Sequence, residues 1–113
     1  MSTRRPELRL KASAPIFAAL GDETRLRLVI FLSAAGPSST ATLTASVDVT
    51  RQAVAKHLRV MKEAGLVSSV YQGRDNVWQI ESSQLAEAQR CIELLTSRWD
   101  AAIERLRTLV EEG

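Results

Sequence analysis

The sequence predicts a small, mostly α-helical (α+β) domain that carries one β-hairpin. Three observations support this fold class. Apolar residues recur at spacings of three and four over most of the chain, which is typical of amphipathic helices. A β-branched and aromatic stretch, residues 67–80, surrounds a glycine-bearing turn and interrupts that pattern. The 113 residues suffice for one modest core, so we expect residues 1–113 to form a single domain.

Two helices are predicted at the start of the chain. Residues 7–20 show apolar positions at helical spacing, although Pro15 leaves the continuity of this helix open. A second helix is predicted in GDETRLRLVIFLSAAGP, with Asp22 as its N-cap and Gly36 at its end. The inward-facing stripe of the second helix is predicted to consist of Leu26, Val29, Ile30 and Ala34.

A short third helix and a charged fourth helix come next. In SSTATLTASV, Leu43 and Val47 are expected to point inward, and Asp48 is suited to the left-handed conformation at a sharp turn. Thr50 is the predicted N-cap of the fourth helix, which Gly65 ends. The inward stripe of the fourth helix is predicted to consist of Val54, Leu58 and Met61.

A β-hairpin and a long helix complete the predicted order. VSSVY and NVWQI are predicted to be two strands joined by the turn QGRD, and a hairpin of this size must pack against the helices. Residues 82–112 then return to helical spacing for more than three heptads. The apolar stripe of this last helix consists of Leu85, Ala88, Ile92, Leu95, Trp99, Ala102, Leu106 and Leu109.

The fourth helix is predicted to carry positive charge on the face opposite its apolar stripe. On a helical wheel, Gln52, Lys56 and Arg59 lie roughly 140–160° from Val54 and are flanked by further cations. The free N–H groups of a helix N-terminus favour anions. Amide and guanidinium groups in this position are suited to base edges in the major groove of DNA.

Composition and charge limit the classes of function. Residues 1–80 hold eleven Lys and Arg against six Asp and Glu, whereas residues 81–113 hold four against seven. A polyanionic partner is therefore expected for the first part. No apolar run approaches the ~18 residues of a membrane span, and MSTRRPELRLKA lacks a signal-peptide core, so we expect a cytoplasmic protein. With one His and no glycine-rich phosphate loop, we predict no enzymatic activity, catalytic residue or cofactor.

The order of the predicted elements indicates a winged helix-turn-helix, because a short helix, a sharp turn and a cationic helix precede a hairpin. LGDETRLRLVIFL, LTASVDVTRQAVAKHLRVMKEAGLV and GRDNVWQI together resemble the ArsR-type winged-helix transcriptional regulators, over roughly residues 14–81. SRWDAAIERLRTLVEE is similar to the C-terminal helix of a subgroup without metal ligands. The resemblance implies a homodimer that binds a pseudo-palindromic operator in double-stranded DNA and usually represses transcription.

The resemblance also assigns regions and residues. Its recognition helix corresponds to residues 50–64 and its wing tip to residues 72–75. The regions it implies are the helix-turn-helix (about 40–64), the wing (67–81) and the C-terminal dimerisation helix (83–112). The residues expected to contact DNA are Thr50, Arg51, Gln52, Ala55, Lys56, His57, Arg59, Lys62 and Arg74.

Four residues depart from the family pattern or leave their role open. Ala55 stands where a serine is usual, so one polar contact to DNA is missing, and Asp48 stands where a glycine is frequent in the turn. His57 is either a phosphate contact or proton sensor, or a histidine at the core edge bonded to a backbone carbonyl. Cys91 is either a redox switch or an ordinary half-buried thiol.

The final helix is predicted to mediate dimerisation together with the first. About 30 helical residues extend ~45 Å, which is more than the small body can cover. An apolar stripe left in water marks an interface. The alternative is a final helix that breaks near Thr96-Ser97 and folds back on its own domain. The expected interface residues are Leu10, Ile16, Phe17, Leu85, Ile92, Leu95, Trp99 and Leu106.

A metal site is not expected. The chain has one Cys and one His, and SSTAT before Leu43 contains no thiol, so a tetrahedral site would need most of its ligands from carboxylates or from symmetry mates. The effector is not predicted. The alternative to DNA binding is a winged-helix protein-interaction module whose cationic face meets an acidic protein.

Overall fold

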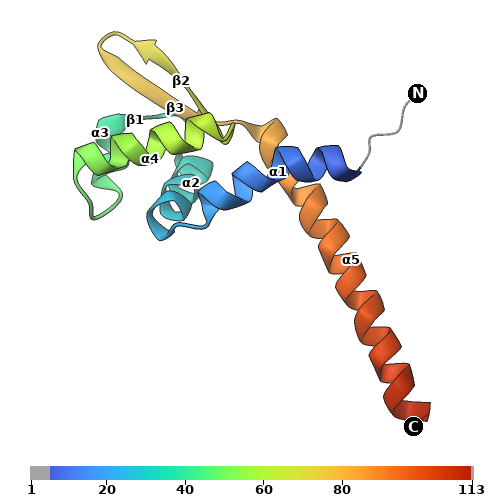
Figure 1. The fold of residues 1–113 in the computed structure, drawn as a ribbon. Coiled ribbons are helices and arrows are strands. Elements are labelled where there is room, and N and C mark those ends of the chain that lie inside the picture. The colour runs from blue at the N-terminus through green and yellow to red at the C-terminus, as the bar shows by residue number, and fades with distance from the viewer. Residues whose placement is uncertain (1–5, 113) are drawn as a thin grey trace.

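The computed structural model describes residues 6–112, which form a helical body, a small antiparallel sheet and one protruding helix (Figure 1). The mostly helical fold class with a β-hairpin is confirmed. Residues 1–5, part of the segment considered for a signal peptide, lie outside the described residues. The elements are α1 (Pro6–Leu20), α2 (Glu23–Ala35), β1 (Ser38–Ser39), α3 (Thr40–Ala45), α4 (Arg51–Glu63), β2 (Val67–Gln72), β3 (Asp75–Ile80) and α5 (Ser82–Glu112).

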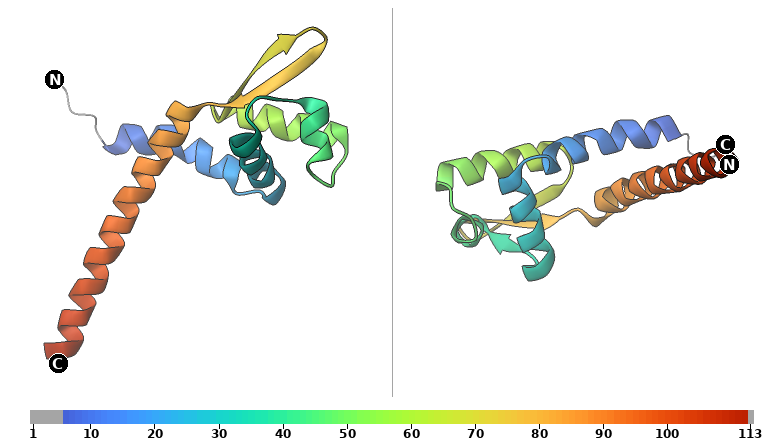
Figure 2. Two further views of the ribbon diagram at one scale, coloured as in Figure 1. Left: turned by 180° about the vertical axis from the view of Figure 1, so that it is seen from behind. Right: turned by 90° about the horizontal axis from the view of Figure 1, so that it is seen from below.

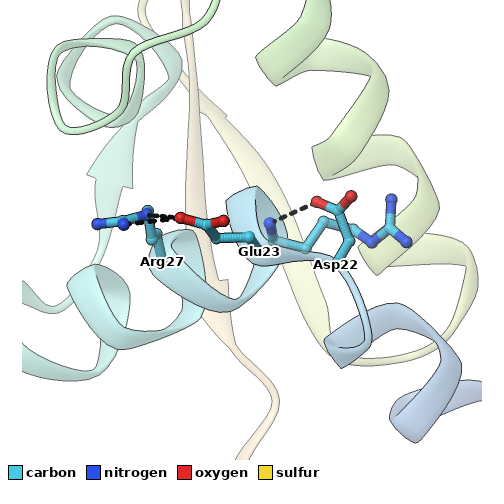
Figure 3. Close-up of polar contacts among 4 residues, drawn as sticks. Asp22, Glu23 and Arg27 are labelled. Carbon is cyan, nitrogen blue, oxygen red and sulfur yellow. Dashed lines mark hydrogen bonds and ion pairs between the residues drawn. The ribbon is translucent and has the colours of Figure 1, made fainter.

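Helix α2 begins and ends where the sequence predicts. The carboxylate of Asp22 accepts a hydrogen bond from the backbone N–H of Arg25 at 3.1 Å (Figure 3), which satisfies one of the free donors of the first turn. Glu23 and Arg27, also drawn in Figure 3, form an exposed ion pair at 2.8 Å one turn apart. At the other end, Gly36 takes a φ of 80° and its N–H bonds to the carbonyl of Leu32.

The predicted inward stripe of α2 is mostly wrong. Val29 is buried as expected, but its buried companions are Leu28 and Leu32. Of the other predicted residues, Leu26 and Ile30 are 44% and 62% exposed, and Ala34 is exposed as well. The reason is that residues 28–32 are all apolar, so the periodicity does not define a single face. Packing against the rest of the body sets the orientation of this helix instead.

The core lies between α1, α2, α3, α4 and the sheet. The predicted stripe of α4 is confirmed, because Val54, Leu58 and Met61 are fully buried, and so is Leu43 of α3. Ile16 is also fully buried in this core, which contradicts its assignment to a dimer surface. Helix α1 runs through Pro15 without a break, so its continuity is settled. Among residues 6–112, no helix is long and apolar enough to cross a membrane.

The turn between α3 and α4 does not use a left-handed residue. All non-glycine residues of the described chain have negative φ, so Asp48 does not take the conformation to which it is suited. Ser46 caps α3 in the right-handed region, and Thr50 already caps α4. Because the reversal is spread over residues 46–50, no single residue has to absorb it.

The sheet has the strand order β1-β3-β2 and is antiparallel throughout. β2 and β3 form the predicted hairpin, with Val67 opposite Ile80, Gln72 opposite Asp75, and Gly73 at a φ of 63° in the turn. The two-residue strand β1 was not predicted, since two serines show no alternation. β1 adds a third strand by pairing with Val77 and Trp78.

Helix α5 leaves the body and stands alone for most of its length (Figures 1 and 2). Its first turns pack against α1, where Ala88 is buried. The helix is continuous from Ser82 to Glu112, so the alternative of a break near Thr96-Ser97 is wrong. A compact chain of this length would have a radius of gyration of about 13 Å. The Cα radius is 18.4 Å, because α5 stretches the molecule to 66 Å.

Candidate nucleic-acid interface

Helix α4 presents a charged face that starts at a well-formed N-cap. The hydroxyl of Thr50 accepts a hydrogen bond from the N–H of Ala53 at 3.1 Å, and the carbonyl of Thr50 accepts from Val54, as the sequence predicts. Opposite the buried stripe, the exposed residues of this helix are Arg51, Gln52, Lys56, Arg59, Lys62 and Glu63. The first acid in this face is Glu63, in the last turn, so the N-terminal end attracts anions through both side chains and helix dipole.

A groove of about 460 Å³ separates α4 from the wing, the β2–β3 hairpin. Its residues come from both sides and from the start of α3: Thr40, Ala55, Arg59, Lys62, Ser69, Val70, Tyr71, Asn76 and Trp78. Lys62 spans the groove, with its Nζ donating to the hydroxyl of Ser69 at 3.1 Å. The half-buried Ala55 leaves room on the helix side, where a serine would add a hydroxyl.

Six of the nine groove residues are not among the contacts expected from the sequence: Thr40, Ser69, Val70, Tyr71, Asn76 and Trp78. Tyr71 and Asn76 are cross-strand partners in the hairpin, and both line the groove beside the cations of α4. The predicted hairpin already indicates that these two residues lie on the same face of the sheet, because partners in an antiparallel pair share one face. Using it requires knowing which face of the sheet turns toward α4, which the sequence alone does not tell. Tyr71 is 75% exposed and its phenol is therefore available to a partner.

The wing tip ends in exposed residues at the far end of the hairpin. Gly73 and Arg74 form the turn, and Asp75 follows directly, so the cation of Arg74 has an acid as its neighbour in sequence. All three residues are exposed. The hairpin projects from the body beyond α4 (Figure 1).

His57 does not belong to the outward face of α4. Its Nδ1 lies 3.1 Å from Nη1 of Arg25 and 3.9 Å from Oδ2 of Asp22, both at the start of α2. The half-buried ring is therefore bonded to a side chain, which contradicts both the expected backbone carbonyl and an outward DNA contact. Because arginine only donates, the contact with Nη1 is a hydrogen bond in the tautomer that carries its proton on Nε2, whereas the ion pair with Asp22 requires a protonated ring.

Asp22 is the anionic member of this cluster. The backbone hydrogen bond from Arg25 lowers the pKa of Asp22 below its ordinary value, with smaller contributions from the charges of Arg25 and His57, and together these outweigh the effect of desolvation. Arg25 is held in place by a second bond, from its Nε to the carbonyl of Ala19 at 2.7 Å. The cluster thus ties α4 to the junction of α1 and α2.

Comparisons with known proteins agree with this geometry. Residues 20–70, which span α2, α3, α4 and part of β2, match a family model described as a helix-turn-helix domain. A regulator of Bacillus subtilis strain 168, the uncharacterized HTH-type transcriptional regulator YuzN, is 41% identical over 55% of this chain and 74% of its own length. The structure of an ArsR-like transcriptional regulator from Rhodococcus sp. RHA1 is 33% identical, with a TM-score of 0.72 over 88% of this chain and 92% of that one. The chain belongs to the ArsR-type winged helix-turn-helix transcriptional regulators.

A third similarity concerns the fold of ArsR-type proteins. A solution structure from Mycobacterium bovis, described as a homodimeric winged helix-turn-helix DNA-binding domain of a possible ArsR-family regulator, covers 92% of this chain and 93% of that one. The sequence identity is 19% and the TM-score is 0.63, so the likeness shows a shared fold.

The residues expected at an ArsR-type dimer surface fall into two groups. Leu85 and Phe17 are partly buried against the protomer core, where Ile16 is already enclosed. The others are exposed in the protomer to between 48% and 62%: Leu10, Ile92, Leu95, Trp99 and Leu106. Leu109, which belongs to the predicted apolar stripe, is exposed as well, and three exposed apolar residues of α5 that were not named from the sequence extend this surface: Leu94, Ile103 and Val110.

A small apolar cleft lies where α5 passes α1. It has a volume of about 350 Å³ and is lined by Phe17, Cys91, Ile92 and Leu95. Cys91 is half-buried and is not in a disulfide. Within residues 6–112, no group of three or more His, Cys, Asp or Glu residues is arranged to hold a metal ion.

Proposed function

We propose that this regulator is a homodimeric repressor that binds a pseudo-palindromic DNA operator. In this proposal α4 enters the major groove, and the wing tip, residues 72–75, contacts the neighbouring backbone. The observation that carries the proposal is the face of α4, where exposed cations and an amide surround a capped helix N-terminus next to a groove. Reading DNA in this way requires no catalytic step.

The contacts are proposed to divide by position on α4. Gln52 and Lys56 lie in the first two turns of α4 at the centre of the face opposite Val54, so we assign them to base edges. The remaining cations are assigned to phosphates: Arg51, Arg59, Lys62 and Arg74. Thr50 would act beside them as the cap that orients the first turn, and Ala55 would allow close approach of a DNA strand. His57 has no contact role in this proposal.

Dimerisation is proposed to occur through α5, with a smaller contribution from α1. The exposed apolar residues of α5 form a surface far larger than the scattered apolar residues of an ordinary monomer. The homodimeric fold of the similar M. bovis domain supports this arrangement. A two-fold dimer would hold two α4 helices about one DNA turn apart, ~34 Å, which suits two half-sites of an operator.

The test is to select duplexes from a random-sequence pool with the wild-type protein and to measure binding by fluorescence anisotropy. We expect a selected site with two inverted half-sites, a stoichiometry of two protomers per duplex and a steep salt dependence. Sedimentation should give a dimer at micromolar concentration. Failure to enrich any duplex sequence, with equal weak binding to scrambled DNA, would contradict the proposal and favour a protein-interaction module.

A further inference from the structure

The wing is anchored to the body at its base. Within the described sheet, β1 pairs with β3 at two positions, Ser38 with Trp78 and Ser39 with Val77. Nearer the tip, Asp75 and Asn76 of β3 pair with β2 alone. The hairpin from residue 70 to residue 75 is exposed, so its outer half projects as an arm (Figures 1 and 2). The position of the tip therefore depends on contacts near Trp78.

Trp78 is the last buried residue of β3 toward the tip. Its side chain is 8% exposed, and its Nε1 donates to the hydroxyl of Thr40 at 2.9 Å. Thr40 is the first residue of α3, directly after the N-cap Ser39. A single side-chain hydrogen bond thus joins the wing to the first helix of the helix-turn-helix, across 38 positions of sequence.

We propose that the bond between Thr40 and Trp78 is a positioning contact that sets the angle of the wing against the helix-turn-helix, so that Arg74 and α4 reach DNA together. The inference rests on the proposed function, since it concerns how the same DNA surface is held in shape. Neither residue touches DNA in this scheme.

The length of the hairpin makes the angle at its base important. Arg74 lies four positions before Trp78, which at about 3.3 Å per residue places the tip ~13 Å from the anchor. A rotation of ~10° at the anchor would move the tip by ~2 Å over that length. Such a shift takes a guanidinium out of hydrogen-bonding range of a phosphate. Apolar packing is non-directional, whereas a hydrogen bond weakens steeply with angle, so the indole N–H supplies the angular restraint.

The same pair also lies in the groove between α4 and the wing. Thr40 and Trp78 line it together with Ala55 and Arg59, so a change in the wing angle also changes the distance from the hairpin to α4. The other polar tie across the groove is Lys62 to Ser69. This hydrogen bond, from Nζ of Lys62 to the hydroxyl of Ser69, is exposed to solvent. In the proposed complex, Lys62 is assigned to a DNA phosphate instead. The Thr40–Trp78 bond persists when Lys62 turns to DNA.

Matched variants separate the hydrogen bond from packing. Thr40→Val keeps the shape and removes the hydroxyl, Thr40→Ser keeps the hydroxyl, and Trp78→Phe keeps an aromatic ring without the N–H. The probe is a fluorescein-labelled 30-bp duplex, on the order of three helical turns, recovered from a random pool by the wild-type protein. Binding is measured at several salt concentrations, at a temperature where melting curves show every variant folded.

We expect Thr40→Val and Trp78→Phe to weaken binding about twofold to tenfold, as the loss of one hydrogen bond would. The slope of log K against log salt should also fall by about one unit, because the Arg74 contact is lost with the wing angle. Thr40→Ser should bind like wild type. In an Arg74→Ala background, Thr40→Val should cause no further loss of DNA affinity. The reason is that Thr40→Val acts by misplacing Arg74, and the contact of Arg74 with DNA is already absent there.

Two results would overturn the inference. One is an additive loss in the Arg74→Ala background, and the other is a weakened Thr40→Val with an unchanged salt slope, since either would mean general destabilisation. A failure of the proposed function is distinguishable from both, because the wild-type protein would then recover no duplex at all and the positioning role would fall with it.

Discussion

The carboxylate oxygen Oδ2 of Asp22 lies 3.9 Å from Nδ1 of His57, so the N-cap of α2 faces the middle of the recognition helix α4. Arg25 bridges the two residues, because its backbone N–H bonds to Asp22 and its guanidinium to His57. One carboxylate therefore serves as a helix cap and as the anion beside an imidazole. The cap and the attachment of α4 are expected to respond together to acid.

The first prediction follows from the lowered pKa of Asp22. A carboxyl group whose pKa is lower in the folded than in the unfolded chain stabilises the fold above its ordinary value, here 3.8, and loses this contribution as the pH falls through the folded pKa. Asp22→Ala should therefore lower the Tm at neutral pH, and the difference from wild type should shrink in acid. Thermal melts from neutral pH to about pH 2.5 would measure this.

Asp22→Asn is the matched control for that series, because asparagine also caps helices but carries no charge. It should retain much of the stability at neutral pH and show a weaker dependence on acid. If the gap between Asp22→Ala and wild type stays constant into strong acid, the charge of Asp22 does not contribute as described.

The second prediction separates base contacts from phosphate contacts on α4. Gln52→Ala should relax the preference for the selected operator over scrambled DNA, by ~1–3 kcal/mol for one lost bidentate contact. Arg59→Ala should weaken binding to both duplexes alike and reduce the salt slope by about one unit. Anisotropy titrations at several salt concentrations measure both effects. A change of preferred sequence in Arg59→Ala, with the salt slope intact, would reverse the assignment.

The third prediction concerns Trp99, which is 62% exposed in the protomer and is the largest residue on the apolar surface of α5. If a partner buries it, Trp99→Ala should cost several kcal/mol of dimer stability, ~3–5 by analogy with protein cores. Sedimentation should then show a shift toward monomer, and operator binding should fall far more than binding to a single half-site. Arg98→Ala, one position away on the same helix, is the control and should remain dimeric. A tight-binding wild-type monomer at micromolar concentration would refute the dimer model.

The fourth prediction concerns the effector. Zinc, cadmium and arsenite are expected to leave DNA affinity unchanged while Cys91 is kept reduced, because the chain contains one Cys and one His. Anisotropy titrations with and without each metal, in the presence of a non-thiol reductant, would measure this. Loss of DNA binding on metal addition that persists in Cys91→Ser would show that a metal site exists after all.

The fold was predictable where a local pattern has one interpretation. Helix α4 is the best case, since its caps, its buried stripe and its charged face all follow from spacing and residue type. Helix α2 is the opposite case, because the apolar run from Leu28 to Leu32 is compatible with more than one buried face. Tertiary packing determines which face is buried, and it buries Leu28 and exposes Ile30.

The candidate site was predictable along α4 and less so across elements. The cations of α4 could be named from the sequence, whereas Tyr71 and Asn76 join them only through the placement of the sheet against α4. His57 shows the same limit, since its partner Arg25 lies 32 positions away on α2. The pairing of Thr40 with Trp78 depends on the short strand β1, which has no pattern of its own.

Because α5 extends away from the body, the lifetime of the protein is expected to depend on its concentration. Past its contacts with α1, this helix has no tertiary support within the described protomer, and isolated helices are marginal in water. A solitary chain would then fray at its C-terminal end and become a substrate for proteases, whereas a paired chain would be protected. Newly made protein would accumulate slowly below the dissociation constant and steeply above it. Dimerisation would thus set a threshold on the steady-state level of the protein.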